Sequence, residues 1–148
     1  ADISKALKPG GKLAFNTSFF EGAHPEETLF FYRKWMLKAI RVLRQEYGLS
    51  PSKAAKVEAR KQLTPEEYRS LVEGHGFRVA KQEINTVQFT KDGFLDISSF
   101  DDFIIGVMPG VPLDKASAAL KEALHRTFCE MKVDSIPRNW LDIVAVRV

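Results

Sequence analysis

The spacing of hydrophobic residues along the chain predicts helices that alternate with a few strands. Short apolar runs that end at turn residues indicate strands, and apolar residues three or four positions apart indicate helices. These signals predict a helix that ends near residue 8, strands at about 12–17, 77–89 and 141–148, and helices at about 26–47, 51–62, 64–73, 99–106 and 115–131. The sequence Lys91-Asp92-Gly93 is typical of a turn, and Asp114 of a helix N-cap.

The longest predicted helix, at about 26–47, combines an apolar stripe with a basic face. The stripe consists of Tyr32, Met36, Ile40, Leu43 and Tyr47, widened by Phe31, Trp35, Ala39 and Val42. From Arg33 to Lys61 there are nine Lys or Arg and two acidic residues, a local excess of +7. Such a region could attract an anionic substrate, a carrier protein, phospholipid headgroups or RNA. A solvated helix face is the simpler interpretation, because we expect no aromatic residues among the basic ones.

The segment 7–17 is the most informative local sequence. It reads Leu-Lys-Pro-Gly-Gly and continues into the apolar run that predicts the first strand. Pro9 cannot continue a helix, Gly10 supplies the positive φ of a helix exit, and Gly11 lets the backbone turn into the strand. The segment therefore predicts one helix-to-strand step of a sheet protein.

Three segments of the chain, taken in order, resemble parts of class I S-adenosylmethionine (SAM) dependent methyltransferases. Segment 7–17 is similar to the region of their fifth strand, 71–79 to the step into strand six, and the apolar run 140–148 to strand seven. The resemblance implies that the parent protein has an α/β fold and that this chain alone is α+β. The chain would contain a partial Rossmann-like sheet with its strands in the order 5-7-6, in which strand seven is antiparallel. The implied parts are a helix end, strand five and loop (1–24), a helical lid (25–62), a helix and strand six (63–90), a helical insertion (91–135) and strand seven (136–148).

The glycine-rich loop that holds SAM in this family has no counterpart among the glycines of the chain. The resemblance therefore implies the C-terminal half of a methyltransferase, cut before strand five. The missing N-terminal half would bind most of SAM, so no cofactor-binding residue is expected here. The parent protein would be an enzyme, and this part alone would be inactive.

The resemblance also implies an acceptor site on the side of the sheet where the strands have their carboxyl ends. Its apolar walls would favour a small-molecule or lipid-like acceptor over nucleic acid. We expect seven aromatic residues to form these walls: Phe19, Phe20, Tyr32, Trp35, Phe100, Phe103 and Trp140. His24 is a candidate general base, although a His beside Pro25 is also an ordinary residue at a helix start.

A second hypothesis is a non-catalytic α+β module that binds an apolar ligand or partner in the same aromatic region. In either case, strand five would lack a neighbour on one side. Such an exposed apolar edge predicts a homodimer through strand five.

Composition adds a few further expectations. The net charge of +3 is too small to indicate nucleic-acid binding, and no apolar run approaches the ~20 residues that span a bilayer. The single cysteine, Cys129, excludes an internal disulfide and favours a cytoplasmic protein. His125 and Cys129 have the i, i+4 spacing of a metal site, but without a third ligand we expect no metal.

Overall fold

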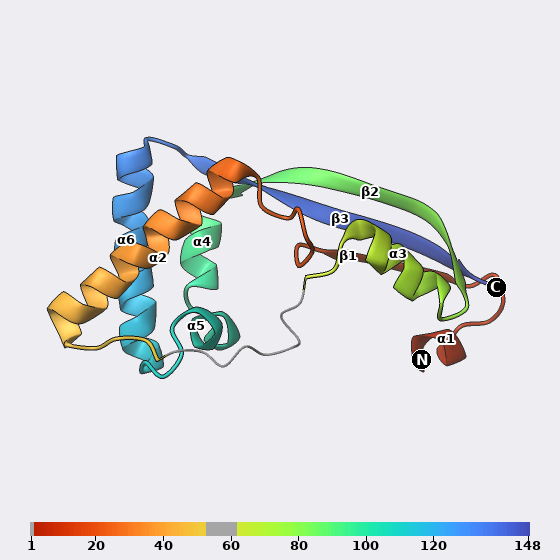
Figure 1. The fold of residues 1–148 in the computed structure, drawn as a ribbon, viewed down its shortest axis with the longest axis horizontal. Coiled ribbons are helices and arrows are strands. Elements are labelled where there is room, and N and C mark those ends of the chain that lie inside the picture. The colour runs from red at the N-terminus through yellow and green to blue at the C-terminus, as the bar shows by residue number, and fades with distance from the viewer. Residues whose placement is uncertain (1, 53–61) are drawn as a thin grey trace. The chain divides into compact units, whose positions relative to one another are not determined.

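The chain folds into two compact units, as a computed structural model of residues 2–52 and 62–148 shows (Figure 1). The sheet unit contains the described residues 2–25, 62–87 and 138–148, and the helical unit contains residues 26–52 and 88–137. In the described residues the helices are α1 (Asp2–Ala6), α2 (Glu26–Tyr47), α3 (Pro65–Glu73), α4 (Lys91–Ile97), α5 (Asp101–Val107) and α6 (Leu113–Met131). The strands are β1 (Lys12–Thr17), β2 (Phe77–Thr90) and β3 (Ser135–Arg147).

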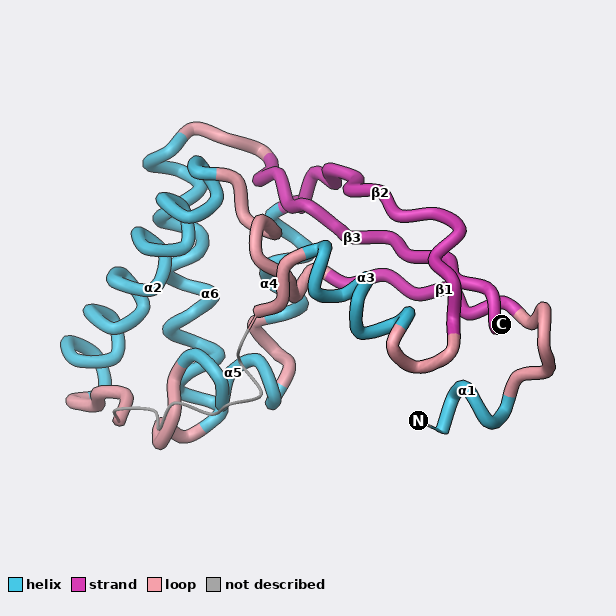
Figure 2. Tube along the Cα trace, turned by 45° about the vertical axis from the view of Figure 1, so that its right-hand side comes forward, coloured by secondary structure: helices cyan, strands magenta, loops and turns pink. Residues whose placement is uncertain are grey.

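The three strands form one open sheet in the order β1-β3-β2 (Figure 2). The sheet is antiparallel, and β1 pairs with β3 from Lys12 opposite Val146 to Thr17 opposite Leu141. The predicted order and the antiparallel central strand are therefore confirmed, and the described chain is α+β. Beyond β1, the described residues provide no further strand on that edge.

One face of the sheet is covered by α3. From β3, Leu141, Ile143 and Ala145 are buried on this face, together with Val72 of α3 and Phe77. The helix begins as its sequence predicts. Its N-cap, Thr64, and Glu67 form a reciprocal capping box, with N to O distances of 2.8 and 3.1 Å.

The two glycines before β1 are both required by the backbone. Gly10 has φ of 79°, and a Cβ added to Gly11 would lie 2.8 Å from the carbonyl oxygen of Lys8. This tight turn places both glycines beside Arg147. The N–H of Gly10 donates to the carbonyl oxygen of Arg147, and the N–H of Arg147 donates to the carbonyl oxygen of Gly11. The helix exit thus extends the ladder between β1 and the central strand.

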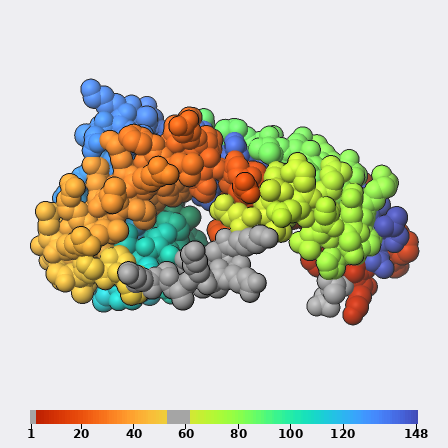
Figure 3. Space-filling model, viewed as in Figure 1, coloured from red at the N-terminus to blue at the C-terminus, as the bar shows by residue number. Residues whose placement is uncertain are grey.

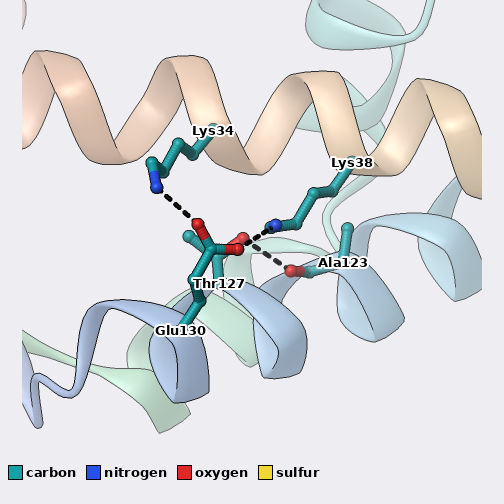
Figure 4. A network of polar contacts seen from close by, with 5 residues as sticks. All are labelled: Lys34, Lys38, Ala123, Thr127 and Glu130. Carbon is teal, nitrogen blue, oxygen red and sulfur yellow. Dashed lines mark hydrogen bonds and ion pairs between the residues drawn. The ribbon is translucent and has the colours of Figure 1, made fainter.

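The helical unit has its own core between α2 and α6, with α4 and α5 packed against it. A group of aromatic rings lies at its centre, in which Phe31 has its ring centroid 5.1 Å from those of both Phe94 and Phe128. At the surface, Lys34 and Lys38 of α2 both donate to the carboxylate of Glu130 on α6 (Figure 4). The same close-up shows the hydroxyl of Thr127 donating to the carbonyl of Ala123, 2.7 Å away.

Several local expectations are wrong. Lys91 to Gly93 is not a turn but the start of α4, because the hydroxyl of Thr90 accepts from the N–H of Gly93 and Phe94 is buried. Asp114 is not an N-cap: α6 begins one residue before it, after Pro112.

Two boundaries also need correction. The last strand begins at Ser135 rather than 141. Pro51 and Ser52 are not helical, and the rest of the helix expected at 51–62 lies almost wholly outside the described residues. On α2, the buried residues are Thr28, Phe31, Trp35, Ala39, Val42 and Leu43, so the core stripe lies to one side of the predicted line through Tyr32, Met36 and Ile40.

Candidate functional site

The loop that follows β1 is the first candidate for a site in the sheet unit, because several contacts hold it on the sheet. Phe20 anchors it: the ring is fully buried against Leu141 and Ile143, and its backbone forms an isolated bridge with Leu63. The preceding residue, Phe19, is exposed, and its carbonyl accepts from the hydroxyl of Tyr68, 2.9 Å away. The two aromatic residues therefore have opposite environments, although the sequence predicted the same role for both.

Asn139 of β3 holds the other end of this loop. Its backbone N–H donates to the carbonyl of Ala23 at 2.9 Å, and its side-chain amide donates to that of Gly22 at 3.0 Å. The amide oxygen accepts from the hydroxyl of Thr86, 2.8 Å away. The sequence analysis did not single out Asn139; its only signal is a polar amide directly before the last apolar run.

His24 lies at the end of the same loop and is partly buried. Burial lowers the pKa of its imidazole, and the positive charge of Arg138 lowers that pKa further. The Arg138 guanidinium itself donates to the carbonyl of Ser18, 3.4 Å away. Both effects favour the neutral imidazole, which is the form that can accept a proton.

Trp140 follows these residues on β3 and is also partly buried. Its indole N–H is enclosed, yet it has no hydrogen-bond partner among residues 2–52 and 62–148. A buried donor without a partner is uncommon in folded proteins.

The seven aromatic residues are divided between the two units. Phe19, Phe20 and Trp140 belong to the sheet unit, and the other four belong to the helical unit. Trp35 is a core residue: its indole N–H donates to the carbonyl of Leu120 at 2.8 Å. In the helical unit, Phe103 stacks on Trp35, Tyr32 is partly buried and Phe100 is exposed. Their role as acceptor contacts stays a prediction.

An apolar groove lies elsewhere in the sheet unit, between α1, β1 and α3. Its volume is about 410 Å³. Ile3 and Leu71 are exposed at its rim, and Leu13, Phe15 and Phe77 contribute to its walls. His75 also lines it, with Nδ1 2.7 Å from the carbonyl oxygen of Leu71. The groove can accept an apolar group and offers few polar contacts.

Two polar hollows, one on the sheet and one in the helical unit, are chemically less suited to bind a ligand. On the sheet, the carboxylate of Asp142 accepts from Asn85, and that of Glu83 accepts from Lys81 at 2.6 Å, so both carboxylates have partners.

In the helical unit, His125 and the exposed thiol of Cys129 line a hollow of about 420 Å³. Within the described part of the chain, no three His, Cys, Asp or Glu side chains are grouped so that they could hold a metal ion.

No helix in residues 2–52 and 62–148 is both long enough and apolar enough to cross a bilayer. Comparison of the sequence with known protein families and with curated proteins finds no match.

Proposed function

We propose that the chain is the C-terminal, acceptor-binding part of a cytoplasmic class I SAM-dependent methyltransferase. The strand order is the observation that carries this proposal. The connection from β1 to β2 contains α2 and α3, and the last strand, β3, is inserted between these two strands. Successive strands are more often direct neighbours in a sheet, so this order is a selective feature. It is the order that the resemblance to methyltransferases implies, with a partial Rossmann-like sheet.

The described residues do not fit SAM as a complete site. A SAM cradle needs a glycine-rich turn between a strand and a helix. Here β1 is followed by eight residues with one glycine, Gly22, and β2 leads directly into α4. In the proposal, SAM supplies the methyl group, and the part of the parent protein that precedes Ala1 holds it.

The residues after β1 would then serve the acceptor. Phe20 and Asn139 fix the loop on the sheet, and the neutral imidazole of His24 can take a proton from an acceptor hydroxyl or amine. The exposed ring of Phe19 in this loop favours a small-molecule or lipid-like acceptor, and most of the rate would come from proximity and orientation.

The test begins with the reading frame that precedes Ala1. About 120 upstream codons should encode a strand, an acidic-x-Gly-x-Gly loop and an acidic residue at the end of the next strand. Calorimetry should then show SAM binding by the longer protein and weak or no binding by the 148-residue chain. A frame without these elements, or a longer protein that does not bind SAM, would contradict the proposal.

The apolar groove supports a second candidate, a non-catalytic module that binds an apolar ligand or partner. An environment-sensitive dye such as anilinonaphthalene sulfonate should bind in the groove and increase its fluorescence. Leu71→Glu should abolish that signal, whereas Ile84→Glu, an equally exposed apolar position on β2, should not. Equal loss in both variants would exclude the groove as the binding site.

A further inference from the structure

The outer surface of α2 carries large apolar side chains that are not part of the core. Leu29, Phe30 and Leu37 have exposed fractions of 45, 53 and 66%. Figure 3 shows the atoms of α2, in orange to yellow, at the surface of the helical unit. Single exposed apolar residues are common, but three on one helix are a feature that needs an explanation.

The same surface is strongly basic. Arg33, Arg41 and Arg44 are exposed, and no acidic residue occurs between Thr28 and Gln45. Within the part of the chain that the structure describes, Arg33 and Arg41 make no ion pair. The lysines of α2 differ, because Lys34 and Lys38 are both paired with Glu130. Lys34 and Lys38 therefore take part in ion pairs within the fold, whereas the charges of Arg33 and Arg41 are not neutralised by a described residue.

Helical geometry places the arginines and the apolar residues on one face. Positions 30, 33, 37, 41 and 44 are three or four residues apart and therefore follow one line along the helix. We call Leu29, Phe30, Arg33, Leu37, Arg41 and Arg44 the α2 outer face. From its first to its last residue, it is about 22 Å long at 1.5 Å per residue.

We propose that the α2 outer face docks on the surface of an anionic lipid membrane. Arginine guanidiniums bind lipid phosphates and carboxylates, and the apolar side chains between them can enter the region below the headgroups. A helix surface is convex, and a fluid lipid surface can adapt to it, whereas a protein partner would need a preformed acidic groove. Glu26 precedes this face by one turn at the start of α2, and from Leu29 to Arg44 the face carries no acidic residue, which matches a negatively charged surface.

This inference goes beyond the proposed methyltransferase function and does not depend on it. The docking is peripheral, so it requires no membrane-spanning helix. It would, however, bring a lipid-like acceptor close to the protein if the proposed function holds.

The experiment is sedimentation of the 148-residue chain with vesicles of phosphatidylcholine containing 30% phosphatidylserine, and with pure phosphatidylcholine. We expect binding only to the anionic vesicles, and weaker binding as salt increases. The double variant Arg33→Gln/Arg41→Gln should bind about 25-fold more weakly, which is about fivefold per arginine. Leu37→Gln should weaken binding about fivefold. All three positions are exposed, so thermal unfolding should stay close to that of the wild type.

The matched control is Lys12→Gln/Arg78→Gln. It removes the same two charges from exposed positions of the sheet unit, and it should retain nearly all binding. Equal losses in the two double variants would overturn the proposal, because net charge alone would then explain binding. The absence of binding to anionic vesicles at low salt would also overturn it. If Leu37→Gln had no effect and polyglutamate displaced the protein completely, the face would bind an acidic polypeptide instead of lipid.

Discussion

Replacing Phe31 by alanine tests whether the aromatic residues of α2 form a core or a ligand-binding wall. Phe31 is fully buried, and its ring contacts four others, those of Tyr32, Trp35, Phe94 and Phe128, with centroids 5.1 to 6.0 Å away. The chain provides a matched control in the next position, Phe30, which has the same side chain and is 53% exposed.

The expected cost of Phe31→Ala follows from this environment. Truncation of a buried Phe to Ala costs about 3–5 kcal/mol, from lost transfer free energy and the cavity that remains. Because the ring also loses several aromatic contacts, we expect about 4 kcal/mol. For a protein of this size, that lowers the melting temperature by about 8–16 °C. Phe30→Ala removes an exposed ring and should change the free energy of unfolding by less than about 0.5 kcal/mol.

Urea unfolding followed by tryptophan fluorescence can measure this difference in the helical unit. The protein has two tryptophans, Trp35 in the helical unit and Trp140 in the sheet unit. In a Trp140→Phe background, the signal therefore reports on the helical core alone. If Phe31→Ala and Phe30→Ala shifted the midpoint equally, the aromatic group would not be a packed core, and our account of the helical unit would be wrong.

Three further predictions concern single interactions. Thr64→Ala removes the α3 cap and should cost about 1 kcal/mol, whereas Thr64→Ser should restore most of it in thermal unfolding. Glu130 has a pKa lowered to about 2 by the bonds from Lys34 and Lys38, so Lys34→Met/Lys38→Met should return its carboxyl titration, followed by ¹³C NMR, toward 4.5. His24 has a folded pKa below its usual 6.5, so its contribution to stability is present above that pH and is lost as the pH falls through the folded value. In urea unfolding, His24→Gln should therefore lose less stability than the wild type between pH 7.5 and pH 5, and equal losses would contradict the assignment.

Local signals in the sequence predicted the elements whose determinants are local. The start of the helix at about 64–73 was predicted, and Thr64, Pro65 and Glu67 specify its cap within four positions. The first strand was predicted with its observed limits, since the Gly10-Gly11 exit and the apolar run define both ends. The strand order required the resemblance to a family, because no periodicity encodes which strands pair.

The candidate site depended on contacts between distant residues, and the sequence predicted less of it. Phe19 and Phe20 are the same residue type in adjacent positions, and only the packing of β3 makes one buried and the other exposed. Asn139 acts on Gly22 and Ala23, which lie more than a hundred positions away in the chain. On α2, periodicity identified an amphipathic helix but did not show that apolar and basic side chains share its outer face.

The central position of β3 has a consequence for synthesis of the protein on the ribosome. Lys12 of β1 pairs with Val146, which is translated 134 residues later (146 − 12). At about 5–20 residues per second, β1 waits roughly 7–27 s for its partner strand. The contacts between α2 and α6 require less of the chain, so the helical unit can fold while β1 and β2 remain unpaired. During that interval both strands are open to pairing with other nascent chains, and chaperones that shield strand edges should increase the yield of folded protein.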